Sequence, residues 1–128
     1  MRYLLDTHTL LWLLDSPSHI PLTTLDKLKD PRNALFISVA SLWEIAIERS
    51  VGKLVISRST QVIIDELPSL SVQLLPILPK HIVYSETLPF HHRDPFDRLI
   101  IAQAITEGYS LISKDRNLPL YPVKVLWD

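Results

Sequence analysis

Short apolar runs alternate along the chain with longer stretches of helical pattern. Runs at residues 3–5, 34–38 and 109–113 have the length of buried strands, a weaker strand is predicted at 72–75, and a last strand is predicted at 123–127. Helices are predicted between them: a short one within residues 16–30 and longer ones at 7–15, 40–51, 59–67, 79–87 and 95–108. Parallel neighbouring strands need a crossover, which is usually helical. The alternation therefore predicts an α/β fold, a three-layer α/β/α sandwich around a short parallel sheet.

The clearest helix boundaries flank residues 95–108. Asp94 precedes Pro95, which matches an N-cap residue followed by proline in the first helical turn. Gly108 can adopt the left-handed conformation that ends a helix. We therefore interpret Asp94 as a structural cap, and Asp97 falls in the first turn of the helix.

Composition limits the kinds of chemistry available to this chain. Its 128 residues, 47% of them apolar, fit a single domain over residues 1–128. The chain has no cysteine, which excludes thiolate zinc sites, thiol nucleophiles and disulfides. Its two glycines exclude a glycine-rich phosphate loop. Any catalytic chemistry must therefore come from other side chains.

Charge and hydropathy give no sign of a membrane or of a general nucleic-acid surface. No apolar run approaches the ~20 residues of a membrane span, and Asp6 interrupts the first apolar run too early for a signal peptide. A cytoplasmic protein is expected. The net charge of −1 means that any nucleic-acid contact must be local.

Four carboxylates fall where a parallel sheet gathers ligands. Asp6 directly follows the first strand, and Asp115 follows the strand at 109–113. Glu44 lies in the helix after the second strand. Asp97 lies at the start of the helix that precedes the fourth strand, at 109–113. Ligands of open parallel sheets bind beyond the carboxyl ends of the strands. The four acids are therefore expected to converge from separate segments.

Each acid also has a purely structural interpretation. Asp6 is a suitable N-cap for the helix that begins near Thr7. Asp115 lies in a polar segment where aspartate favours turns. Asp97 would interact favourably with a helix dipole whatever its function. The sequence alone leaves these alternatives open.

Glu44 is the most informative of the acids. Its helix is apolar nearly all round, and Arg49 and Lys53 are at the wrong spacing to pair with it. A buried carboxylate is neutralised, pairs with a cation or binds a metal. Four neighbouring carboxylates would repel one another unless a divalent cation compensated them. Oxygen ligands favour Mg²⁺ or Mn²⁺.

Four ordered segments of the chain resemble one known family. The likeness is to PIN domains, and within them to the VapC-like toxins of type II toxin–antitoxin modules. It covers nearly the whole sequence and is carried by LLDTH at 4–8, ISVASLWEI at 37–45, RDPFDRLIIAQA at 93–104 and LISKD at 111–115. The family has an α/β/α fold, which agrees with the fold predicted from the alternating pattern.

The resemblance implies a ribonuclease dependent on Mg²⁺ or Mn²⁺, with one or two ions. It places Asp6, Glu44, Asp97 and Asp115 on the catalytic and metal-binding acids of the family, and Thr7 and Ser113 on supporting hydroxyl positions. It also implies an RNA substrate, a cognate antitoxin protein and a homodimer. A non-catalytic module that binds RNA or protein is the alternative, although such modules usually lack one of the acids.

Cations, histidines and tryptophans around these motifs are less specific. Arg98, Lys114 and Arg116 flank the acids and could bind phosphate, or could be ordinary surface charges. His91 and His92 are adjacent, so they point in different directions, and we assign them structural or surface roles. The two tryptophans that lie in apolar helices are assigned to the core, namely Trp12 and Trp43.

Overall fold

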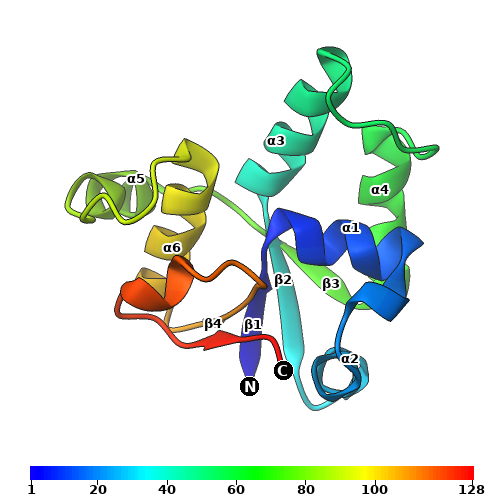
Figure 1. Cartoon of the computed structure of the whole chain (residues 1–128), viewed down its shortest axis with the longest axis horizontal. Coiled ribbons are helices and arrows are strands. Elements are labelled where there is room, and N and C mark those ends of the chain that lie inside the picture. The colour runs from blue at the N-terminus through cyan, green and yellow to red at the C-terminus, as the bar shows by residue number, and fades with distance from the viewer.

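A five-stranded, all-parallel sheet forms the centre of the molecule (Figure 1). The structure is a computed structural model that describes residues 1–128. The strand order is β3-β2-β1-β4-β5. The strands are β1 (Arg2–Leu5), β2 (Ala34–Ser38), β3 (Val72–Leu75), β4 (Ser110–Ile112) and β5 (Val125–Leu126). The strand order reverses beside β1, which pairs with β2 on one side and with β4 on the other.

Six helices cover the two faces of the sheet. They are α1 (Thr7–Asp15), α2 (Leu22–Lys29), α3 (Val39–Ser50), α4 (Thr60–Glu66), α5 (Pro79–Glu86) and α6 (Pro95–Glu107). Figure 1 shows α1, α3 and α4 on one side of the sheet and α5 and α6 on the other. The prediction of an α/β/α sandwich is confirmed.

Successive residues of β1 contribute to two separate cores. Tyr3 and Leu5 belong to a cluster with residues of α1 to α4, whereas Leu4 belongs to a cluster dominated by α6. Successive side chains of a strand point to opposite faces, so a strand between two helical layers is apolar at every position. This explains why β1 appears in the sequence as a continuous apolar run that ends at Asp6.

Aspartate side chains cap the first turns of α1 and α6. Asp6 accepts a hydrogen bond from the Thr9 N–H at 2.8 Å, which makes it the N-cap of α1. Asp94 accepts from the Phe96 and Asp97 N–H groups at 2.9 and 3.2 Å, as its predicted capping role requires. Gly108 ends α6 with a φ of 74°.

The structure differs from the predicted elements in several places. It contains three short 3-10 helices that the sequence pattern did not indicate, at Pro17–His19, Leu67–Leu70 and Leu118–Leu120. The assignment of Trp43 to the core is wrong, because Trp43 is 61% exposed. Only one side of α3 packs into the core, and Trp43 lies on the other side with its ring edge against Phe96. Trp12 is half-buried and packs against the first core.

None of the helices is both long and apolar enough to span a membrane.

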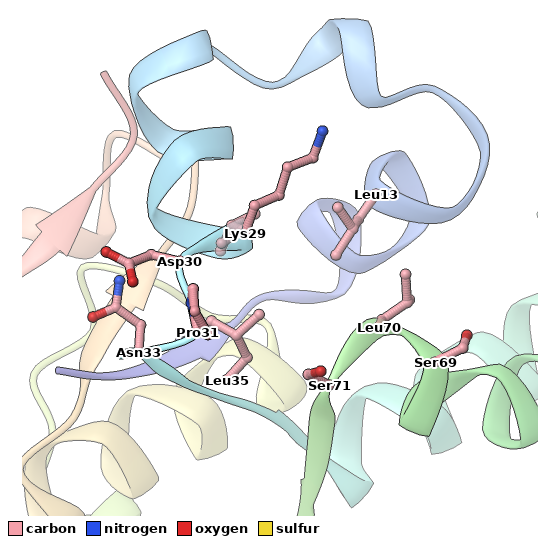
Figure 2. Close-up of a pocket in the computed structure, with 10 residues that line it drawn as sticks. Leu13, Lys29, Asp30, Pro31, Asn33, Leu35, Ser69, Leu70 and Ser71 are labelled. Carbon is pink, nitrogen blue, oxygen red and sulfur yellow. The ribbon is translucent and has the colours of Figure 1, made fainter.

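A cleft of about 370 Å³ lies at the amino edge of the sheet, next to the start of β2 (Figure 2). Its wall is formed by residues from the end of α2, the start of β2 and the segment before β3, including Asp30, Leu35 and Ser71. Arg32 hydrogen-bonds the Asp30 carboxylate and lowers its pKa to about 2. This cleft is at the opposite edge of the sheet from the four predicted site acids.

Candidate active site

The carboxyl ends of β1 and β4 lie side by side at the point where the strand order reverses. Leu5 is in register with Ile112, and the Asp6 N–H donates to the Ile112 carbonyl at 3.2 Å. Asp6 therefore leaves β1 next to the residues that follow β4. Such a reversal point is where open parallel sheets bind ligands.

Ser113 connects the two acids that follow these strands. Its hydroxyl donates to the Asp6 carboxylate and accepts from the Asp115 N–H at 3.0 Å. Asp115 in turn accepts from the Asn117 N–H at 2.8 Å, so it also shapes its turn. Asp6 caps α1 and Asp115 stabilises its turn, as the structural interpretations of the sequence predict. Both residues also belong to the acidic cluster.

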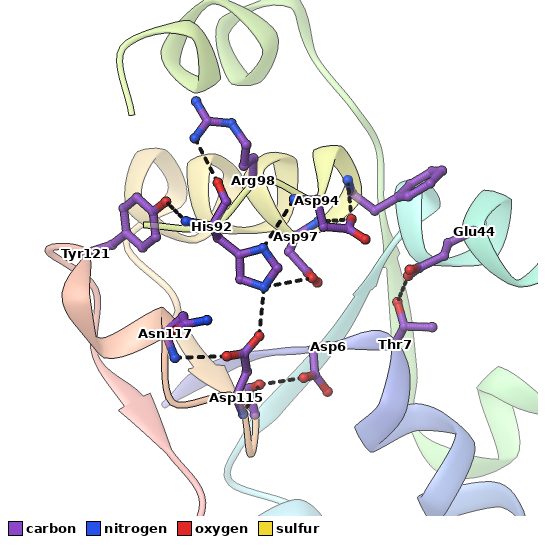
Figure 3. A network of polar contacts seen from close by, with 12 residues as sticks. Asp6, Thr7, Glu44, His92, Asp94, Asp97, Arg98, Asp115, Asn117 and Tyr121 are labelled. Carbon is purple, nitrogen blue, oxygen red and sulfur yellow. Dashed lines mark hydrogen bonds and ion pairs between the residues drawn. The ribbon is translucent and has the colours of Figure 1, made fainter. Parts of the chain in front are cut away.

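Asp97 completes the cluster from α6, together with a histidine. His92 Nε2 lies 3.2 Å from Asp97 Oδ2 and 2.8 Å from Asp115 Oδ2, and Figure 3 shows the ring pointing between the two carboxylates. The ligand atoms of His92, Asp97 and Asp115 all lie within 4.8 Å of one another. His92 thus belongs to the site, and its interpretation as a structural or surface residue missed this position.

Backbone contacts fix the orientation of the His92 ring. The His92 N–H donates to the Tyr121 hydroxyl at 2.9 Å, and its Nδ1 accepts from the Asp94 N–H at 3.3 Å. A ring nitrogen that faces an N–H group acts as an acceptor, so the ring proton is on Nε2. His92 Nε2 therefore donates a hydrogen bond to Asp115, and the same nitrogen lies 3.2 Å from Asp97, so the ring brings these two acids together.

Glu44 reaches the site from α3 through a different contact. Its Oε1 accepts from the Thr7 hydroxyl at 2.6 Å, and no basic side chain pairs with it. Burial raises the pKa of Glu44, an effect that the Thr7 hydrogen bond opposes. Since Thr7 directly follows Asp6, Glu44 lies on the opposite side of Asp6 from Asp115 (Figure 3). The carboxylate lacks a cation of its own.

Asp97 is the acid whose ionisation is most disfavoured. Burial raises its pKa from 3.8 to about 7, the charges of Asp94, Glu44 and Asp6 act in the same direction, and His92 acts in the opposite one. A carboxyl group held this way among like charges favours a proton or a cation beside it. The carboxylate oxygens gathered here are the hard ligands that suit a divalent cation such as Mg²⁺ or Mn²⁺.

The acids open onto a cleft of about 450 Å³, here called the acidic cleft. Its lining consists of three of the acids and three other polar or aromatic side chains: Asp6, Asp97, Asp115, His8, Trp12 and Lys114. Trp12 is the only apolar side chain among them. A charged ligand in this cleft would contact the acids and Lys114 together.

The three candidate phosphate-binding cations have different environments. Arg98 is only 9% exposed, and its guanidinium donates to four backbone carbonyls at 3.0 to 3.2 Å while lying over the Phe90 ring. These contacts use the guanidinium inside the fold and give Arg98 a structural role, which differs from an ordinary surface charge. Lys114 and Arg116 are exposed and remain candidates.

Replacing Glu44 with glutamine tests whether this acid belongs to a cation site. A ligand present at 100 times its Kd stabilises the folded state by about 2.7 kcal/mol. Losing one carboxylate is expected to weaken Mg²⁺ binding about tenfold, which removes about 1.4 kcal/mol of that stabilisation. Thermal unfolding with and without Mg²⁺ measures the difference. The exposed Glu86→Gln is the control, and equal shifts in wild type and Glu44→Gln would exclude Glu44 as a ligand.

The fold and the site together define an α/β/α protein with an acidic site at the carboxyl edge of a parallel sheet. The sequence pattern of the family described as PIN domain matches residues 3–124. The chain belongs to the PIN domain family.

Solved structures with the same fold come from toxin–antitoxin complexes. A chain of VapBC2 from Rickettsia felis, bound to a promoter DNA fragment, superposes with a TM-score of 0.74 at 21% identity over 100% of both chains. A chain of DNA-bound VapBC from Salmonella typhimurium gives 0.72 at 15% identity, covering 98% of this chain and 97% of that one. VapBC-1 from Haemophilus influenzae gives 0.67 at 18% identity, covering 98% and 97%. A comparison with curated proteins gives no match.

Proposed function

We propose that this protein is a metal-dependent ribonuclease that hydrolyses RNA phosphodiester bonds. The observation that carries the proposal is the meeting of Asp6, Asp97 and Asp115 at one open cleft, with the pKa of Asp97 raised to about 7. Three segments of the chain supply acids there, and no lysine or arginine pairs with them. Membership of the PIN domain family and the likeness to VapBC chains agree with this function.

The residues of the site have distinct roles in this proposal. Asp6, Asp97 and Asp115 would hold Mg²⁺ or Mn²⁺, with Glu44 beside them. A bound divalent cation stabilises charge on phosphoryl oxygens and activates a water molecule. Ser113 orients Asp6 and Thr7 orients Glu44 through their hydroxyl hydrogen bonds.

His92 keeps Asp97 and Asp115 close together, because its Nε2 donates to Asp115 and lies 3.2 Å from Asp97 Oδ2. Asp97 has to be ionised to bind a cation, and its pKa of about 7 means that ionisation is completed above neutral pH. Metal binding is therefore favoured as the pH rises through this value.

The proposal includes partners. The VapBC structures are toxin–antitoxin complexes, which supports a role as the toxin of such a module, acting in the cytoplasm with a cognate antitoxin. An exposed apolar row on α3 supports a homodimer, because such rows are usually covered by a partner. The row consists of Val39, Trp43, Ile47 and Val51. A monomer in light scattering would contradict the dimer.

Cleavage of total cellular RNA by the purified protein tests the nuclease function. We expect discrete products with Mg²⁺ or Mn²⁺ and none with EDTA. Asp6→Asn should abolish them, because asparagine can still cap α1 but carries no charge. The exposed Asp65→Asn is the matched control and should cleave like wild type. RNA binding by folded protein without cleavage in either metal would support the non-catalytic alternative.

A further inference from the structure

A second cleft adjoins the acidic cleft on the side of β5. This Trp127 cleft has a volume of about 400 Å³, and its wall includes Lys114, Asp115, Arg116, Trp127 and Asp128. Lys114 and Asp115 line both clefts. The two clefts therefore form one continuous surface that starts at the acids and passes over the loop after β4.

Two tryptophans from opposite ends of the chain meet along this surface. The ring centroids of Trp12 and Trp127 are 5.5 Å apart, with the ring planes inclined at 50°. Trp12 lines the acidic cleft and Trp127 lines the adjoining one, and both are half-buried. Lys114 Nζ lies 6.0 Å from the centre of the Trp12 ring. Trp12 also stacks on His19, with ring centroids 5.7 Å apart, so the part of each tryptophan ring that faces a cleft is the aromatic surface beside the acids.

Two cations accompany the tryptophans. Lys114 and Arg116 are exposed, and neither forms an ion pair within the protein. Arg116 shares the Trp127 cleft with Asp115 and Asp128, so this cleft contains charges of both signs. The cations are free to contact an anionic ligand that lies across both clefts.

We propose that this surface binds one unpaired nucleotide of the RNA strand, next to the bond to be cleaved. The base lies against Trp12 and Trp127, and the neighbouring phosphates contact Lys114 and Arg116. Aromatic faces and free cations side by side are the features that bind single-stranded nucleic acid. The inference rests on the proposed ribonuclease function, because that function places RNA in the acidic cleft.

An unpaired nucleotide suits this surface better than a duplex. A base in a duplex is stacked on both faces and must be flipped out before it can contact an aromatic side chain, which costs a few kcal/mol. A base in a single strand has already exposed its faces. The preference should therefore be for single strands and loops, with affinity that depends on the presence of a base at this position.

Binding measured without cleavage tests the subsite. Fluorescence anisotropy in EDTA would compare a single-stranded oligoribonucleotide that spans the mapped cleavage site with the same strand carrying one abasic residue beside that site. Stacking on an aromatic side chain contributes about 1 to 3 kcal/mol per base, so the abasic strand should bind about tenfold more weakly. This comparison uses wild-type protein and does not depend on the folding of any variant.

Variants assign the effect to particular side chains. Trp127→Leu and Trp12→Leu should weaken binding of the intact strand about tenfold, and Trp127→Phe should largely retain it. Val55→Ala is the control, because this apolar side chain is 92% exposed and lines neither cleft. Lys114→Ala and Arg116→Ala should each weaken binding and reduce its salt dependence. Lys124→Ala, at another exposed lysine, is their control.

The outcomes separate the subsite from the proposed function. Equal binding of the abasic and intact strands, by protein that still cleaves RNA, overturns the subsite and leaves the ribonuclease function intact. Equal binding of the single strand and its duplex also overturns it. If folded wild-type protein cleaves no RNA with Mg²⁺ or Mn²⁺, that result would instead count against the ribonuclease function.

Discussion

Replacing Asp97 with asparagine is expected to reduce RNA cleavage about 100-fold or more and, at the same time, to stabilise the metal-free protein above pH 7. Removing the charge weakens the cation site, and even changes to groups that only orient metal ligands cost 10- to 100-fold. The same charge is unfavourable in the metal-free fold, where burial and the neighbouring acids raise its pKa to about 7.

The sign of the stability effect follows from this raised pKa. The folded protein holds a proton on Asp97 up to about pH 7, whereas the unfolded chain releases it near 3.8. The protonated Asp97 carboxyl therefore makes its full contribution to the free energy of unfolding below pH 3.8. This contribution is lost as the pH rises through 7. Each pKa unit corresponds to about 1.4 kcal/mol, so the shift from 3.8 to about 7 means that full ionisation costs about 4 kcal/mol.

Thermal unfolding in EDTA between pH 5 and pH 8 measures this cost. The melting temperature of wild type should fall between pH 5 and about pH 7 more than that of Asp97→Asn, and above pH 7 the separation between the two curves should stay constant. Saturating Mg²⁺ should restore wild type alone. The exposed Asp65→Asn should follow wild type throughout. The same pH dependence for wild type and Asp97→Asn between pH 5 and pH 7 would show that ionisation of Asp97 does not destabilise the metal-free fold.

The positions of the acids could be predicted because they depend on general features of a parallel sheet. Asp6 and Asp115 follow strands that the apolar pattern marks clearly, and the carboxyl ends of parallel neighbours lie at one edge. Asp97 has a fixed place in α6 because Asp94 and Pro95 define where the helix begins. Local sequence signals therefore determine these positions.

His92 and Trp43 could not be placed in this way. His92 lies in an irregular loop, and its orientation depends on a hydrogen bond from its own N–H to Tyr121, 29 residues away. No periodic pattern describes such a contact. The sequence signal for placing His92 at the site was its position two residues before the capping Asp94. Trp43 lies in a helix that is apolar nearly all round, and the sequence does not show which side of such a helix faces the sheet.

The pair Trp12 and Trp127 shows the same limit over a longer distance. The sequence has no stretch in which aromatic and basic residues alternate, so it gave no indication of a strand-binding surface. The fold creates one by bringing α1 and the segment after β5 together beside Lys114. Surfaces assembled from distant segments become visible only when the topology is known.

Arg98→Ala is expected to destabilise the protein by about 3 kcal/mol or more, because it removes four hydrogen bonds of a charged group, each of which contributes about 1.5 to 3 kcal/mol. The guanidinium of Arg98 joins α6 to the end of α5 and the loop that contains His92. Its four acceptors are the carbonyls of Ser85, Leu88, Pro89 and His92. Losing these bonds also releases the loop that positions the His92 ring.

Urea or thermal unfolding at pH 6 would measure the loss of stability. Arg98→Lys should recover only part of it, because a single ammonium group cannot reproduce the fork of donors that guanidinium offers to several acceptors. Arg93→Ala, at an exposed arginine five positions earlier, is the matched control and should unfold like wild type. Lys114→Ala should also keep full stability while it weakens RNA binding. A stable Arg98→Ala with impaired RNA binding would instead support the phosphate contact expected from the sequence.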